Sequence, residues 1–281
     1  MMSVLVGISV ISLWIKDIRR LQTLENGVYR QLLGGRGGTP IAILRGEVGS
    51  SMVRTRVIQA RLILVKSIIE GENTLLKQVL DEIMRVGKSR WYLTLMEYLR
   101  DVGITFEQLG RMDRTEIKCK VRNYDNRKWF ENLSQLTDRE IYRKFKKSVG
   151  FSFGYDNRNI SDLLFRARSN TLDLNDFKRH KGGAVSCDLC GALREDIAHF
   201  LLECPRLERY RDRNLIGSIG GTGDRVDRVG SLLFNKANIE KIKKMLGTLW
   251  KERDIILMRY NRESHQQGGK GKVTRGNKLP G

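Results

Sequence analysis

The sequence predicts a mostly α fold, made of irregular helical bundles with a small Cys/His-rich helical region and a disordered basic C-terminal tail. Apolar residues recur every three or four positions along much of the chain, which is the spacing of one helix face. Hydrophobic residues make up 40% of the chain and prolines number only three, so most of it should fold. After Asn261 almost no apolar residue remains, and this composition predicts the tail over residues 261–281.

An apolar run opens the chain, from Met1 to Ile15. It is shorter than the roughly 20 apolar residues that a membrane span needs, and it has neither a positive start nor a clear cleavage site. The run predicts a buried helix or strand, with a weak signal anchor as the alternative. Apolar positions between Ile18 and Leu32 then predict a helix over 16–33, and the glycines after it predict a plain connector.

The other helices are predicted by apolar spacing together with residues that begin or end helices. The expected elements are 39–49 closed by Gly49, a longer helix through Ile69 capped by Ser50 and Ser51, 72–102 with a break at Gly87, a helix begun by Thr105, helical segments over 111–147 and 160–169, a helix after Pro205, and helices at 229–234 and 237–259.

Basic residues greatly outnumber acidic ones, with 52 Lys and Arg against 32 Asp and Glu and a formal net charge of +20. Such an excess on a folded chain indicates a polyanionic partner, and RNA or DNA is the usual one. A merely solvated basic surface is the alternative. The candidate contacts to the nucleic-acid backbone are Arg54, Arg56, Arg61, Lys118, Lys120, Arg122, Arg127, Lys128, Arg143, Lys144, Lys146, Lys147, Arg166, Arg168, Lys178 and Arg179.

Three of the four cysteines lie within eighteen residues, in the pattern C-x2-C-x8-H-x4-C. The candidate ligands Cys187, Cys190, His199 and Cys204 match a tetrahedral structural Zn²⁺ site, which uses thiolates and imidazoles at short spacing. With four protein ligands the ion would stabilise the fold and would not catalyse. The alternative is an ordinary helix histidine among buried thiols. The remaining cysteine, Cys119, is assigned no role.

Two parts of the chain resemble a known family. The run Asp17-Ile-Arg-Arg-Leu21, Glu25-Asn26-Gly-Val28-Tyr29-Arg30, Leu32-Leu33-Gly34, Thr39-Pro40-Ile41 and Leu44-Arg45-Gly46-Glu47-Val48-Gly49 resembles the region after the polymerase palm in non-LTR (LINE-type, jockey-like) retrotransposon reverse transcriptases. The stretch Leu163–Asn170 and the Cys187–Pro205 motif resemble the zinc-binding C-terminal region of the same proteins. The resemblance implies a helical thumb-like or connecting region over 1–150 and a zinc-binding helical region over 151–260.

The sequence lacks the residues for polymerase chemistry. Two-metal polymerisation needs a pair of aspartates, and no Asp-Asp dipeptide occurs in the 281 residues. We therefore expect no enzyme activity and no catalytic residue. We also expect no membrane association and an intracellular location, in the nucleus, the cytoplasm or both. The alternatives are the non-catalytic part of an active RNA-directed DNA polymerase whose palm is encoded upstream, a basic protein-interaction module, and a relic fragment.

Overall fold

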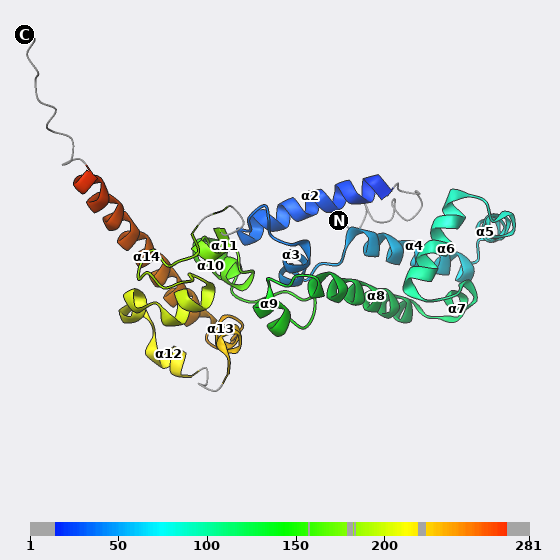
Figure 1. Cartoon of the computed structure of the whole chain (residues 1–281). Helices are drawn as coiled ribbons and strands as arrows, with labels where there is room; N and C mark the ends of the chain where they lie inside the picture. Colours follow the sequence, from blue (N-terminus) through cyan, green and yellow to red (C-terminus); the bar gives the residue numbers. More distant parts are fainter. Residues whose placement is uncertain (1–14, 157, 179–181, 183, 219–222, 269–281) are drawn as a thin grey trace, which may run out of the picture. The chain divides into compact units, whose positions relative to one another are not determined.

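The computed structural model describes residues 15–156, 158–178, 182, 184–218 and 223–268 (Figure 1). Within these ranges the chain is mostly helical and contains no strand, only an isolated bridge between Val48 and Phe151, so the predicted α class is confirmed. Residues 1–14 of the buried element expected over 1–15, and residues 269–281 of the tail expected over 261–281, lie outside the described residues. No helix in the described part is both long and apolar enough to span a membrane.

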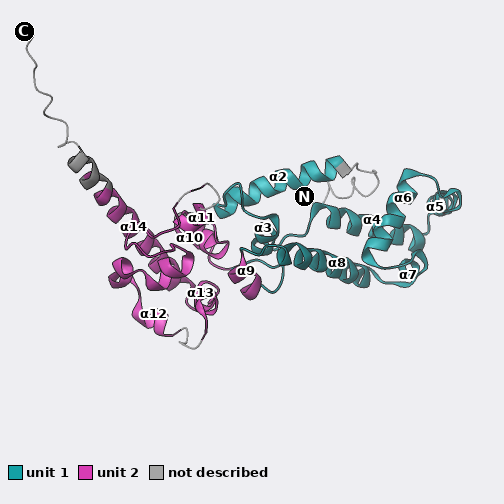
Figure 2. Ribbon diagram, in the orientation of Figure 1, with its two compact units in different colours: residues 1–138, 146–152 teal, residues 139–145, 153–281 magenta. Residues whose placement is uncertain are grey.

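Two compact units divide the chain (Figure 2). Unit 1 contains residues 1–138 and 146–152, and unit 2 contains residues 139–145 and 153–281. This division differs from the expected one after residue 150 chiefly because the short helix α9 (Glu140–Phe145) belongs to unit 2. There Tyr142 and Phe145 pack against Phe234 of the same unit.

Unit 1 is built around the packing of α4 (Val53–Glu70) against α8 (Arg114–Ser134), whose apolar faces share one core. Val57, Ile58 and Leu62 of the first are buried against Ile117 and Val121 of the second. The helices of this unit are α2 (Ile15–Leu33), α3 (Ile41–Val48), α4 (Val53–Glu70), α5 (Thr74–Val86), α6 (Arg90–Val102), α7 (Phe106–Arg111) and α8 (Arg114–Ser134).

Most predicted helix ends of unit 1 are present. Gly49 and Gly87 adopt left-handed conformations, with φ of 74° and 65°, that end α3 and α5. Thr105 begins α7 through a reciprocal capping box with Gln108. The caps predicted at Ser50 and Ser51 are wrong, because α4 begins after Met52 without a side-chain cap from its own segment.

Tertiary contacts replace that missing cap. The backbone N–H of Met52 donates to Asp125 Oδ1 at 3.3 Å, and that of Val53 donates to Gln22 Oε1 at 2.9 Å. Asp125 is buried and also accepts from Thr55 and, with both carboxylate oxygens, from Arg45. A buried carboxylate is tolerated only when it is paired and hydrogen-bonded, so this network fixes α3, the start of α4 and α8 together.

Helix α2 packs with its polar side inward. Gln22 caps α4, Asn26 is buried, and Tyr29 donates to Ser50 Oγ at 2.7 Å. The apolar residues Leu24 and Val28 are instead 68% and 52% exposed. The spacing predicted the helix correctly, but most of its apolar stripe faces outward.

Unit 2 has one core beneath its longest helix. Leu246 and Leu249 of that helix are fully buried, as are Leu164, Leu232 and Leu233 of two helices that pack on it. The remaining elements are α10 (Arg158–Arg168), α11 (Asn175–Lys178), the π-helix η2 (His199–Glu203), the 3-10 helix η3 (Pro205–Tyr210), α12 (Arg213–Gly217), α13 (Arg225–Leu233) and α14 (Ile239–Gly268). Because α14 continues to Gly268, the first part of the expected tail is helical, although it lacks an apolar face to signal this.

Candidate metal centre and basic surfaces

Two of the four candidate ligands lie on a tight turn. The backbone N–H of Gly191 donates to the carbonyl of Cys187 at 2.8 Å, and the N–H of Cys187 donates to the carbonyl of Ala192 at 2.8 Å. Gly191 has φ of 74°, a left-handed conformation that a residue without Cβ adopts at little cost. The turn therefore holds Cys187 and Cys190 on one loop.

The other two ligands lie at the ends of a π turn. His199 begins η2, and the backbone N–H of Cys204 donates to the carbonyl of His199 at 2.8 Å, which is the i→i+5 bond of a π turn. In a regular α-helix, residues five apart differ by about 140° around the axis. The wider π turn reduces that angle and brings His199 and Cys204 to one side. The x4 spacing of the motif thus has a structural reason that sequence spacing alone did not show.

The four ligand atoms form one cluster, with all of them within 4.8 Å of one another. Cys187 Sγ lies 4.0 Å from Cys204 Sγ, and Cys190 Sγ lies 3.3 Å from His199 Nε2. Around a tetrahedral zinc ion with ordinary bond lengths, the corresponding separations are about 3.8 Å and about 3.6 Å. The donor set and its dimensions therefore fit a four-coordinate metal ion.

Neighbouring groups orient these ligands. The backbone N–H of His199 donates to Asp196 Oδ1 at 2.8 Å. In the ring, Nδ1 lies 4.0 Å from Glu203 Oε2, and Nε2 is directed at Cys190 Sγ. Arg211 donates to the carbonyl oxygens of Leu201 at 2.9 Å and Cys204 at 2.8 Å. A metal-binding histidine is usually oriented by a contact of its second ring nitrogen, and Glu203 lies beside that nitrogen here.

Electrostatics of the cluster also favour a cation. A hydrogen bond to Cys204, in which the Cys187 thiol is the donor, and burial together raise the pKa of Cys187 well above its ordinary value. Two buried thiols this close cannot both ionise without positive charge between them, because like charges oppose each other strongly in a buried site. A metal ion supplies that charge and deprotonates coordinating thiols.

Among the candidate nucleic-acid contacts, two are corrected to internal roles. Arg61 is fully buried, with its guanidinium 5.5 Å from the ring centre of Tyr98. Arg168 is 4% exposed and donates to the carbonyl oxygens of Leu233 at 2.9 Å and Phe153 at 3.1 Å. Neither side chain is available to a ligand. The sequence pattern could not separate them from surface arginines, because both lie one position away from apolar core residues.

Further candidates are exposed in part but have acidic partners. Arg54 pairs with Glu97 and Asp101, and Arg56 pairs with Glu25. The four lysines with such partners are Lys128 with Glu131, Lys144 with Asp227, Lys146 with Glu47, and Lys178 with Asp173. Arg143 and Arg166 are partly buried, Lys147 is exposed, and Arg179 lies outside the described residues.

Helix α8 keeps three exposed candidates, Lys118, Lys120 and Arg122, that form no ion pair with any described residue. We call these three residues the α8 basic group: Lys118 and Arg122 share one side of the helix, and Lys120, about 200° from Lys118 around the axis, lies on another side. Arg127 extends it, although its guanidinium also donates to the carbonyl of Asp101 at 3.3 Å. Of the sixteen predicted contacts, these lie together on one element and remain accessible.

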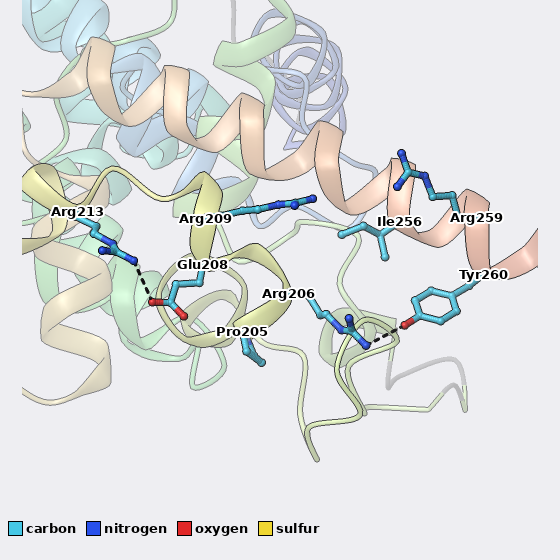
Figure 3. A pocket seen from close by; sticks show the side chains of 8 residues that line it. All are labelled: Pro205, Arg206, Glu208, Arg209, Arg213, Ile256, Arg259 and Tyr260. Atoms are coloured by element: carbon cyan, nitrogen blue, oxygen red, sulfur yellow. Dashed lines mark hydrogen bonds and ion pairs between the residues drawn. The ribbon is translucent and has the colours of Figure 1, made fainter.

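A second group of arginines was not among the predicted contacts. Arg206, Arg209, Arg213 and Arg259 line a groove in unit 2, together with Tyr260 (Figure 3). The three-residue spacing of Arg206 and Arg209 was a usable signal, but only if the segment after Pro205 was recognised as a 3-10 helix, in which such residues align.

Comparisons of the chain with protein-family models, with curated proteins and with solved structures give no match.

Proposed function

We propose that this chain is a zinc-stapled, mostly helical module that binds RNA or DNA, of the kind found after the palm in non-LTR retrotransposon reverse transcriptases. Zn²⁺ is the ion we assign to Cys187, Cys190, His199 and Cys204, because three thiolates and one imidazole at tetrahedral spacing are its preferred structural donors. The role of the ion is to hold the π turn of η2 against the tight turn that carries Cys187 and Cys190. No catalytic step is assigned to the chain.

The observation that carries the nucleic-acid proposal is the α8 basic group, which is exposed and has no acidic partner among the described residues. Most other candidate bases are paired or buried. Lys118 and Arg122 lie one helical turn apart, which is about 6 Å along the axis. Backbone phosphates are the partners that such unpaired cations suit, and contact with phosphates is largely independent of the base sequence.

The test measures the affinity of the purified, zinc-loaded chain for labelled RNA and DNA over 50–300 mM salt. The variant Lys118→Gln/Lys120→Gln/Arg122→Gln should bind more weakly and reduce the slope of log affinity against log salt by about 2. The control variant Lys241→Gln/Lys244→Gln/Lys251→Gln removes the same charge from exposed lysines of α14 and should retain most of the slope. If the unaltered chain binds neither nucleic acid at low salt, the proposal fails.

A second candidate function is that of a non-catalytic part of a polymerase whose palm lies upstream or on another polypeptide. The exposed apolar stripe of α2 favours it, because Leu21, Leu24, Val28 and Leu32 present side chains that a protein surface would cover. A separately expressed palm domain of this type should bind the chain and lose that binding with Leu24→Glu/Val28→Glu. Equal binding by this variant would exclude α2 as the contact.

A further inference from the structure

A groove of about 660 Å³ lies between η3 and α14 of unit 2 (Figure 3). Its walls come from segments some fifty residues apart, and the two elements pack directly against each other. Its volume is within the usual range for a ligand site, about 300–1,000 Å³. The lining is rich in arginine, which distinguishes the groove from the mainly apolar pockets that take small organic molecules.

The first wall is set by the geometry of the 3-10 helix. Residues three apart are eclipsed in such a helix, so Arg206 and Arg209 point to the same side. Pro205 begins the helix, and Arg213 follows from α12 at the same edge of the groove. Arg211, between them, turns inward to the metal-binding turn. This wall therefore begins directly after the candidate ligand Cys204, and Arg211 fixes it to the carbonyl oxygen of that residue.

The second wall is one face of α14. Ile256, Arg259 and Tyr260 occupy positions i, i+3 and i+4, which share a helix face. Figure 3 shows the hydroxyl of Tyr260 meeting the guanidinium of Arg206 across the groove, at 3.4 Å. Tyr260 is 39% exposed, so part of its ring is available to a ligand.

The groove has a strong positive charge. Four arginines and one carboxylate, Glu208, line it, giving 4 − 1 = +3. Glu208 lies 3.6 Å from Arg213, and both side chains are largely exposed, so this pair holds neither group tightly. Arg259 forms no ion pair with a described residue. The electrostatics therefore select an anion with several charges.

We propose that this groove binds the backbone phosphates of single-stranded nucleic acid, with one unpaired base against Tyr260 and Ile256. The inference rests on the proposed function and names a second site for it, on unit 2. Guanidinium groups pair with phosphate oxygens through parallel hydrogen bonds, and an aromatic ring accepts the face of any base. A base inside a duplex has no exposed face to stack, so the tyrosine favours an unpaired strand.

The test compares fluorescently labelled single-stranded RNA with the same sequence as a duplex, using the full zinc-loaded chain. Arg206→Gln/Arg209→Gln should reduce the single-strand salt slope by about 1.4, since each phosphate contact contributes about 0.7. Tyr260→Ala should weaken single-strand binding roughly tenfold and duplex binding much less, whereas Tyr260→Phe should keep most of the affinity. Lys244→Gln/Lys251→Gln is the charge-matched control on α14, and circular dichroism with zinc content verifies that each variant is folded.

The outcomes of these experiments distinguish the groove from the α8 basic group. If the chain binds nucleic acid and both groove variants bind like the control, the groove inference is overturned while the proposed function stands. If Tyr260→Ala weakens single-strand and duplex binding equally, or not at all, a stacking site is overturned. If the unaltered chain binds no nucleic acid, both proposals fail together.

Discussion

Glu195 and Arg253 form a buried bidentate ion pair between the loop before η2 and α14, with N–O distances of 2.8 and 2.9 Å. Their side chains are only 2% and 4% exposed. Glu195 Oε2 also accepts from the backbone N–H of Asn175 at 2.9 Å. The Glu195 carboxylate thus connects three segments: its own loop between Cys190 and His199, the start of α11 at Asn175, and α14 at Arg253.

Removing one member of this pair should destabilise unit 2 strongly. Glu195→Gln keeps the size of the side chain but leaves the Arg253 charge buried without its counter-charge, and breaking such a pair costs about 3–5 kcal/mol. Amide hydrogen exchange of the full chain should show faster exchange across unit 2 and unchanged exchange in unit 1. The matched control is Arg213→Gln, which breaks the Arg213–Glu208 pair of the same unit, whose members are 83% and 64% exposed.

Breaking the exposed pair should cost at most about 1 kcal/mol, because solvent screens the charges. Replacing the buried pair by apolar residues, with Glu195→Leu and Arg253→Met together, should cost less than Glu195→Gln alone. Equal effects of Glu195→Gln and Arg213→Gln would show that burial does not determine how much an ion pair contributes to stability.

Metal removal should loosen unit 2 and leave unit 1 folded. Metal analysis of the purified chain should give one zinc ion per molecule, and Cys187→Ser should abolish tight binding, because four ligands define the site. A strong chelator should then accelerate amide exchange across the metal-binding loop and η2. Cys119→Ser is the control, since this exposed thiol of α8 lies outside the cluster. A chain that retains full zinc after Cys187→Ser would contradict the assignment.

The sequence predicted the α class and the Cys/His cluster because both depend on local patterns. Helix spacing identified α4 and α6, and the ligand spacing identified all four members of the cluster. The sequence patterns failed where contacts between residues far apart in the chain determine the structure. The cap of α4 comes from Gln22 and Asp125, which no local pattern reveals. The outward stripe of α2 and the burial of Arg61 are likewise set by the partners that the rest of unit 1 provides.

Gly230 of α13 should not tolerate a larger residue. A Cβ at this position would lie 2.0 Å from Phe145 Cε2, and Phe145 is held by stacking on Phe234 with ring centres 5.9 Å apart. Gly230→Ala should therefore destabilise unit 2 by about 1–3 kcal/mol, the usual cost of overpacking. Gly247→Ala in α14 is the control, because its Cβ would meet nothing closer than 3.7 Å.

The control should gain up to about 1 kcal/mol from the better helix propensity of alanine. Urea unfolding of both variants measures the two changes in the free energy of unfolding. Opposite signs are expected, although both substitutions are glycine to alanine within a helix. A stabilising Gly230→Ala would mean that α9 does not pack on α13 as the structure shows.

Tyr98 should make unit 1 sensitive to alkaline pH. Its side chain is 2% exposed, and burial raises the pKa of the phenol above its ordinary value, opposed by Arg61 and Arg54 nearby. The raised pKa means that the folded state holds the proton after the unfolded chain, with a pKa of about 10, has lost it. This contribution to stability is complete below about pH 10 and is lost as the pH rises through the folded pKa.

Tyr98→Phe removes the titrating group and keeps the ring that contacts Arg61 and Arg54. Urea unfolding at pH 8 and pH 11 should therefore show a smaller loss of stability for this variant than for the unaltered chain. Tyr92→Phe, which replaces a less buried tyrosine of the same helix, is the control and should follow the unaltered chain. If Tyr98→Phe loses as much stability as the unaltered chain, the alkaline transition arises from other groups, and the buried phenol does not contribute to it.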